Sequence, residues 1–151
     1  RTLSTGVQYE GVGITSLLSR GHAVVVTDYE GLGTPGHHPY VNRDSQGRSA
    51  LDAARAALRL PGTDLAPDSK TVVSGYSQGG GAAAAAGEMQ PTYAPDVNLV
   101  GIAAGAPPSD MIGTLERVDG AGHGQEGLAG AGEAVEAFDR RGDRRRCARV
   151  R

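Results

Sequence analysis

Apolar residues occur along the chain in short β-branched runs, and these runs predict strands. Residues 22–28, HAVVVTD, form a nearly continuous apolar run, which is typical of a parallel strand buried on both faces. Residues 71–75, TVVSG, and residues 98–105, NLVGIAAG, are similar runs that end at a glycine. We therefore expect three strands.

Helical patterns lie between and around these runs. Residues 9–20, YEGVGITSLLSR, predict a short helix followed by Gly21, which suits a left-handed C-cap. Residues 45–60, SQGRSALDAARAALRL, have one apolar face and stop at Pro61. The alanines of residues 82–86 predict a third helix. This order implies right-handed crossovers, so we predict an α/β fold with three parallel strands and flanking helices.

A G-x-S-x-G pattern, GYSQG at residues 75–79, separates the second strand from the third helix. A serine on so tight a turn has a strained backbone, and only residues without a β-carbon fit beside it, which accounts for Gly75 and Gly79. The turn would raise the Ser77 hydroxyl above the sheet, near the positive end of the helix. It would also aim the backbone N–H of Gln78 at a developing oxyanion. This geometry predicts a catalytic nucleophile.

The turn makes a positional prediction as well. We expect the strand to end near Ser74 or Gly75 and the helix to begin near Gln78. The alternative is an ordinary glycine-rich turn, because a chain with 24 glycines produces such pentapeptides by chance.

Two other motifs suggest cofactors or metals. Residues 31–36, GLGTPG, match the dinucleotide-binding G-x-G-x-x-G pattern, but Pro39 keeps the following chain extended where a helix should begin. His37 and His38 lack a further ligand at metal-binding spacing, so we interpret them as loop histidines that line a pocket. We expect neither a cofactor nor a metal.

Composition narrows the class of protein. A chain of 151 residues suits one modest domain, and its net charge of −2 offers no basic field for nucleic acid. Cys147 is the single cysteine, and no apolar run is long enough for stable membrane insertion. The chain starts at Arg1 with neither an initiator Met nor a signal peptide, so we expect its natural beginning to lie elsewhere.

The composition changes near Asp119, beyond which Gly, Ala and Arg dominate. Such a segment buries too little apolar surface to offset its ordering entropy of roughly 1–2 kcal/mol per residue. We therefore divide the chain into a partial α/β domain, residues 1–119, and a disordered or weakly helical tail, residues 120–151. Translation of a GC-rich gene out of frame would also give such a tail.

Taken together, several motifs resemble one known family, the secretory (LIP-type) triacylglycerol lipases. The resemblance extends from about Tyr9 to Asp119 and rests on GLGTPG, HPYVNR, SQGR, LDAARAA, GYSQGGGAA, PTYAPD and GAPPSD. It implies an α/β-hydrolase fold, hydrolysis of acylglycerol esters, no cofactor, and secretion. It also implies that Ser77 is the nucleophile and that Gln78 provides an oxyanion N–H. Acyl chain length, lipase against carboxylesterase activity, and oligomeric state stay open.

The rest of the catalytic triad is less well defined. Ser77, Asp110 and His123 follow the Ser, Asp, His order of this fold, but nothing in GAGHGQEG would hold the His123 imidazole against Ser77. We therefore expect Asp110 and His123 not to pair there. The alternative to a serine lipase or esterase is a catalytically silent fragment, at most a module that binds acyl chains or other proteins.

The resemblance also places a strand with the second oxyanion donor upstream of Arg1, between the first two strands of this chain. We expect that position to be an empty slot in the sheet, which either stays open or closes because the two strands slide together. Unpaired strand edges promote aggregation, so we expect the isolated chain to be poorly soluble or molten.

Overall fold

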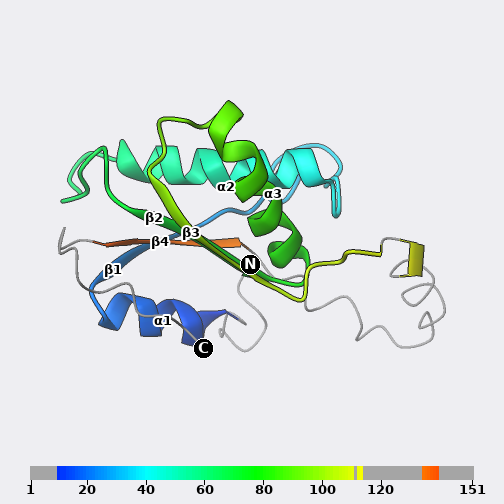
Figure 1. The fold of residues 1–151 in the computed structure, drawn as a ribbon, viewed down its shortest axis with the longest axis horizontal. Coiled ribbons are helices and arrows are strands. Elements are labelled where there is room, and N and C mark those ends of the chain that lie inside the picture. Colours follow the sequence, from blue (N-terminus) through cyan, green and yellow to red (C-terminus); the bar gives the residue numbers. More distant parts are fainter. Residues whose placement is uncertain (1–9, 111, 114–133, 140–151) are drawn as a thin grey trace.

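The computed structural model describes residues 10–110, 112–113 and 134–139. They form a layered α/β structure in which a sheet separates one helix from two others (Figure 1). Helix α1 (Gly11–Ser19) covers one face, and α2 (Arg43–Leu58) and α3 (Gln78–Tyr93) cover the other. The strands are β1 (His22–Val26), β2 (Thr71–Tyr76), β3 (Leu99–Gly105) and β4 (Ala134–Asp139).

The α/β class and the three predicted strands are confirmed. The spatial order is β1-β4-β2-β3, and β2 pairs with β3 in parallel. Strand β4 is antiparallel to both β1 and β2, so β1 and β2 run in the same direction. The three predicted strands are therefore parallel, and a fourth, antiparallel strand lies among them.

Strand β4 corrects two predictions. The slot between β1 and β2 is filled, and the irregular tail expected for residues 120–151 contains a strand at Ala134–Asp139. Glu136 lies opposite Val25 of β1 and Val73 of β2, so one segment pairs with both open edges. Unpaired backbone groups at buried edges are costly, and pairing with β4 satisfies them. The rest of the tail lies outside the described residues.

The core lies between the sheet and helices α2 and α3. Its largest fully buried apolar side chains are Leu51, Val73 and Val97. Helix α3 packs closely because its residues are small: a β-carbon on Gly47 of α2 would lie 2.9 Å from the Ala85 β-carbon of α3. The alanine-rich sequence thus allows α3 to approach α2 and the sheet together.

The helix boundaries differ from the prediction by one or two residues at α1, which spans Gly11–Ser19, and at both ends of α2. Helix α2 begins at Arg43, two residues early, because the Asn42 side chain caps it by accepting a hydrogen bond from the Ser45 N–H at 3.0 Å. Helix α3 continues from the predicted alanine-rich stretch through Pro91 to Tyr93. The Ala94 N–H still donates to the Gln90 carbonyl at 3.0 Å, so the proline does not end the helical hydrogen bonding.

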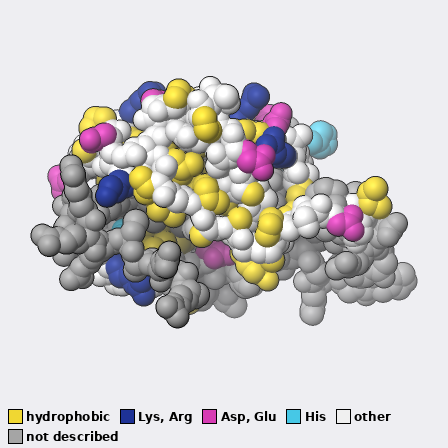
Figure 2. All heavy atoms as spheres, viewed as in Figure 1, with side chains coloured by type: hydrophobic (Ala, Val, Ile, Leu, Met, Phe, Trp, Pro, Cys, Tyr) yellow, Lys and Arg dark blue, Asp and Glu magenta, His cyan; other side chains and the backbone are white. Residues whose placement is uncertain are grey.

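The surface separates charged from apolar regions. Acidic and basic side chains are interspersed over α2, and apolar side chains gather along β3 (Figure 2). Val100 and Ile102 of β3 are 44% and 39% exposed. Among the helices that the structure describes, none combines the length and apolarity that a membrane span requires.

Candidate active site

Ser77 lies at the turn between β2, which ends at Tyr76, and α3, which begins at Gln78. Its backbone has φ 54° and ψ −115°, a strained conformation for a residue with a β-carbon. The predicted position is confirmed, with the strand one or two residues longer than expected. Ser77 is half-buried and sits at the carboxyl end of a central strand.

Glycines make the turn sterically feasible. A β-carbon on Gly75 would overlap the backbone of Gly79, and one on Gly80 would overlap the carbonyl of Gly105. The Ser77 N–H donates to that Gly105 carbonyl at 2.9 Å, which anchors the turn to β3. The strand, the turn and the helix therefore meet closely around Ser77.

The first turn of α3 lies directly beside Ser77. Ser77 occupies the N-cap position, and its carbonyl accepts the Gly81 N–H at 3.0 Å, but its side chain makes no capping hydrogen bond. The first N–H groups of a helix lack intrahelical acceptors and carry a partial positive charge. Ser77 therefore lies next to the first N–H groups of α3, of which that of Gln78 is the first.

A second loop approaches this turn from residues 27–42, between β1 and α2. His38 Nε2 lies 2.9 Å from the side-chain Nε2 of Gln78, and His38 Nδ1 lies 2.9 Å from the Glu30 carbonyl oxygen. The ring stacks on Tyr29, with centroids 5.9 Å apart. Sequence reasoning did not find the contact between His38 and Gln78, which are 40 residues apart.

The glycine pattern at residues 31–36 lies in this loop, where Gly31 allows a close turn. Gly31 has φ +78°, and a β-carbon there would lie 2.6 Å from the His38 backbone nitrogen. The next helix, α2, begins only at Arg43, so the pattern does not open a helix as a dinucleotide site requires. Gly31 instead allows the loop to fold back so that His38 reaches Gln78.

Of the two further triad candidates, the structure describes only Asp110. Asp110 is exposed, and its carboxylate accepts the Gly113 N–H at 3.0 Å, as a helix-capping aspartate does. His123 lies outside the described residues, so the prediction that Asp110 and His123 do not pair beside Ser77 stays a prediction.

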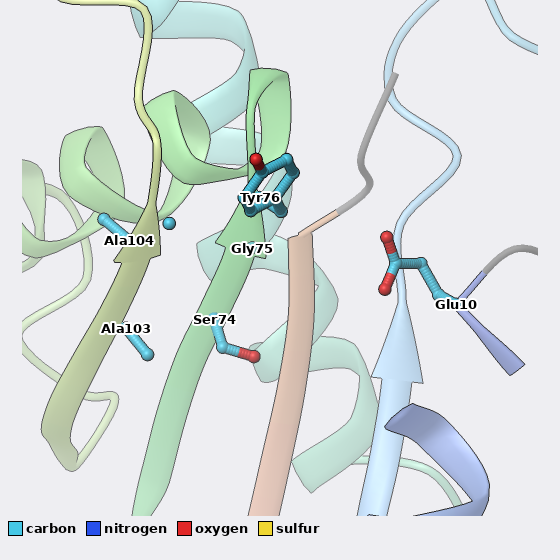
Figure 3. Close-up of a pocket in the computed structure, with 7 residues that line it drawn as sticks. Glu10, Ser74, Gly75, Tyr76, Ala103 and Ala104 are labelled. Carbon is cyan, nitrogen blue, oxygen red and sulfur yellow. The ribbon is translucent and has the colours of Figure 1, made fainter. Parts of the chain in front are cut away.

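A shallow hollow of about 440 Å³ lies beside the carboxyl ends of β2 and β3 (Figure 3). Neither Ser77 nor the two loop histidines are among its lining residues. On β2, Thr71 and Val73 are buried on the sheet face that α2 and α3 cover. Because side chains alternate along a strand, Ser74 and Tyr76 point to the opposite face. The hollow is therefore on the sheet face away from α3. Its lining residues are Glu10, Ser74, Gly75, Tyr76, Ala103, Ala104 and Gly105.

The fold and the turn define an α/β protein with a serine at a strand-to-helix elbow. The chain belongs to the secretory lipase family, whose model matches residues 1–141. That match begins before Tyr9 and continues past Asp119, so the resemblance is longer than we expected.

Individual relatives agree with this assignment. The secreted triacylglycerol lipase LIP3 of Malassezia restricta is 32% identical over 134 residues, covering 87% of this chain and 28% of that protein. Lipase 4 of Candida albicans is 40% identical over 116 residues, covering 75% and 24%. The probable inactive lipase MT1628 of Mycobacterium tuberculosis is 37% identical over 120 residues, covering 80% and 26%. The chain thus spans about a quarter of the length of these relatives. No solved structure gives a significant match.

Proposed function

We propose that this chain is the nucleophile-bearing part of a serine hydrolase that cleaves carboxylic esters of acylglycerols. The single observation that carries the proposal is the strained elbow at Ser77, with φ 54° and glycines packed on both sides. A backbone conformation of this kind costs on the order of 1–3 kcal/mol, and functional sites are where such strain is retained. Membership of the secretory lipase family supports the same assignment.

The reaction would proceed through an acyl-enzyme. The Ser77 hydroxyl oxygen attacks the ester carbonyl carbon, and the carbonyl oxygen becomes an oxyanion near the first turn of α3. The Gln78 N–H donates to that oxyanion. The Ser77 proton passes to a general base, and the C–O bond to the alcohol breaks as that base returns the proton to the leaving oxygen. Water, deprotonated by the same base, then attacks the acyl group and releases the acid from Ser77. No cofactor takes part in this scheme.

The proposal extends to fold and substrate. The four-stranded sheet, β4 included, and its flanking helices form part of an α/β-hydrolase domain, and the substrates are lipids or small esters. The names of the Malassezia relatives include the word secreted, which supports an extracellular location. The scheme also needs a general base, and none of the described residues that could act as one is in contact with Ser77.

A second function is favoured by one comparison. MT1628 is named a probable inactive lipase and matches 80% of this chain. A chain with the elbow but no base would retain only about 10³–10⁴-fold catalysis over water. In that case the chain is catalytically silent and at most binds acyl chains or another protein.

Hydrolysis of p-nitrophenyl butyrate by the 151-residue chain separates the two functions. We expect release of p-nitrophenol above the rate of Ser77→Ala, with Ser19→Ala, on the exposed side of α1, unchanged from the wild type. Equal rates for the wild type and Ser77→Ala would support the silent fragment. Tributyrin as a second substrate then tests whether an acylglycerol is accepted.

A further inference from the structure

Both ring nitrogens of His38 are engaged, and their partners determine the tautomer. The Glu30 carbonyl can only accept, so the Nδ1 atom at 2.9 Å must hold the hydrogen. The neutral ring then accepts at Nε2, where the Gln78 side-chain amide donates across 2.9 Å. A backbone carbonyl, an imidazole and an amide thus form one continuous hydrogen-bonded chain.

The ring is also fixed by packing. It stacks on Tyr29 with an interplanar angle of 22°, and Tyr29 is itself only 6% exposed. Tyr40 contacts the ring edge-on, with centroids 6.1 Å apart. Tyr29 has φ 59°, so the residue on which the imidazole stacks has a strained backbone, as Ser77 does.

Gln78 connects this loop to the elbow. It is the first residue of α3 and directly follows Ser77, and its side chain is buried, with 2% exposed. Because side-chain rotamers are coupled to the backbone dihedrals of the same residue, holding the Gln78 amide favours one backbone conformation and with it one direction of the N–H. Oxyanion donors gain their effect from being aimed before the charge develops.

We propose that His38 is a positioning residue that acts through Gln78, holding the Gln78 backbone N–H toward the oxyanion formed on Ser77. The inference rests on the proposed function, because it assigns a role within that same site. His38 is assigned no contact with substrate and no proton transfer.

The kinetics of labelling by a fluorophosphonate test the proposal in the 151-residue chain. His38→Phe keeps a flat ring against Tyr29 and removes both hydrogen bonds, whereas His38→Gln retains an acceptor near the position of Nε2. We expect His38→Phe to lower the maximal labelling rate by about 10–100-fold with unchanged probe affinity, and His38→Gln to recover most of it. His37→Phe, at the exposed neighbouring histidine, is the control and should label like the wild type.

Gln78→Leu removes the other partner and covers the case in which His38→Phe does not fold. It should slow labelling to a similar extent, and the double variant should be no slower than either single one. A His38→Phe rate within about twofold of the wild type, or fully additive effects, would overturn the inference.

An NMR measurement that does not depend on any reaction of Ser77 separates this inference from the proposed function. In ¹⁵N NMR spectra of the wild type, we expect the hydrogen of the His38 ring on Nδ1. The signal of the Gln78 backbone amide should shift in His38→Phe and return to its wild-type position in His38→Gln. If the wild type fails to label while these signals behave as expected, the proposed function fails and the hydrogen-bonded contact stands. An unshifted Gln78 amide in a folded His38→Phe variant would reject the positioning role whatever the labelling shows.

Discussion

Gly75 and Gly79 approach so closely that a β-carbon on Gly75 would overlap the Gly79 backbone. This contact connects the end of β2 to the first turn of α3 and leaves Ser77 at the apex between them. The elbow therefore depends on the absence of a side chain at Gly75, two residues before the serine.

Gly75→Ala should consequently destabilise the chain. The methyl group meets rigid backbone, so we expect the free energy of unfolding to fall by at least about 1–3 kcal/mol, measured by urea denaturation. Gly13→Ala, in the middle of α1, is the matched control because no atom lies within 4 Å of its added β-carbon. That control should gain roughly 0.5–1 kcal/mol from higher helix propensity. Equal stability of Gly75→Ala and the wild type would show that the turn tolerates a side chain.

Pairing with β4 should protect backbone amides of the neighbouring strands β1 and β2 from hydrogen exchange. Glu136 pairs with Val25 and Val73, and proline at that position removes a donor from the middle of the sheet. We expect Glu136→Pro to disrupt the pairing of β4 and so to speed amide hydrogen exchange in β1 and β2, whereas Glu136→Ala keeps the N–H and the protection. Unchanged exchange in Glu136→Pro would mean that β1 and β2 are stabilised without β4.

An ion-pair network joins α2 to the segment before β3 and should make stability depend on pH. The Arg55 Nε donates to Asp96 Oδ2 at 2.9 Å, and hydrogen bonding to Arg55 lowers the pKa of Asp96 below its ordinary value of 3.8. A lowered folded-state pKa adds stability above the unfolded value that is lost as pH falls through the folded value.

We therefore expect the urea midpoint to fall on acidification below about pH 4, and to fall less in Asp96→Asn. Asp64→Asn, in the loop between α2 and β2, serves as the control and should follow the wild type. A wild-type midpoint with the same acid dependence as Asp96→Asn would exclude a contribution from this pair.

The sequence predicted local features of the fold better than long-range ones. The β-branched runs located β1, β2 and β3, and the glycines around Ser77 located the elbow, because both signals arise within a few residues. Strand β4 was missed because Ala134–Asp139 lies in a Gly/Ala/Arg-rich context, and its pairing depends on edges far away in the sequence.

The candidate site was predictable to the same extent. The G-x-S-x-G pattern identified Ser77 and Gln78, whose positions depend on adjacent residues. The role of the loop at residues 27–42 was not visible, because the His38 contact with Gln78 depends on how that loop folds back over Gly31. In the sequence that glycine looked like part of a dinucleotide motif.

The most direct test of the central claim is the site and rate of fluorophosphonate labelling in the 151-residue chain, measured by peptide mass mapping. An activated nucleophile reacts much faster than ordinary serines. The account predicts a single adduct at Ser77 that is absent from Ser77→Ala and from the urea-unfolded chain. No adduct, or an adduct that forms equally on Ser19 or on the unfolded chain, would contradict the claim that this elbow presents a catalytic serine.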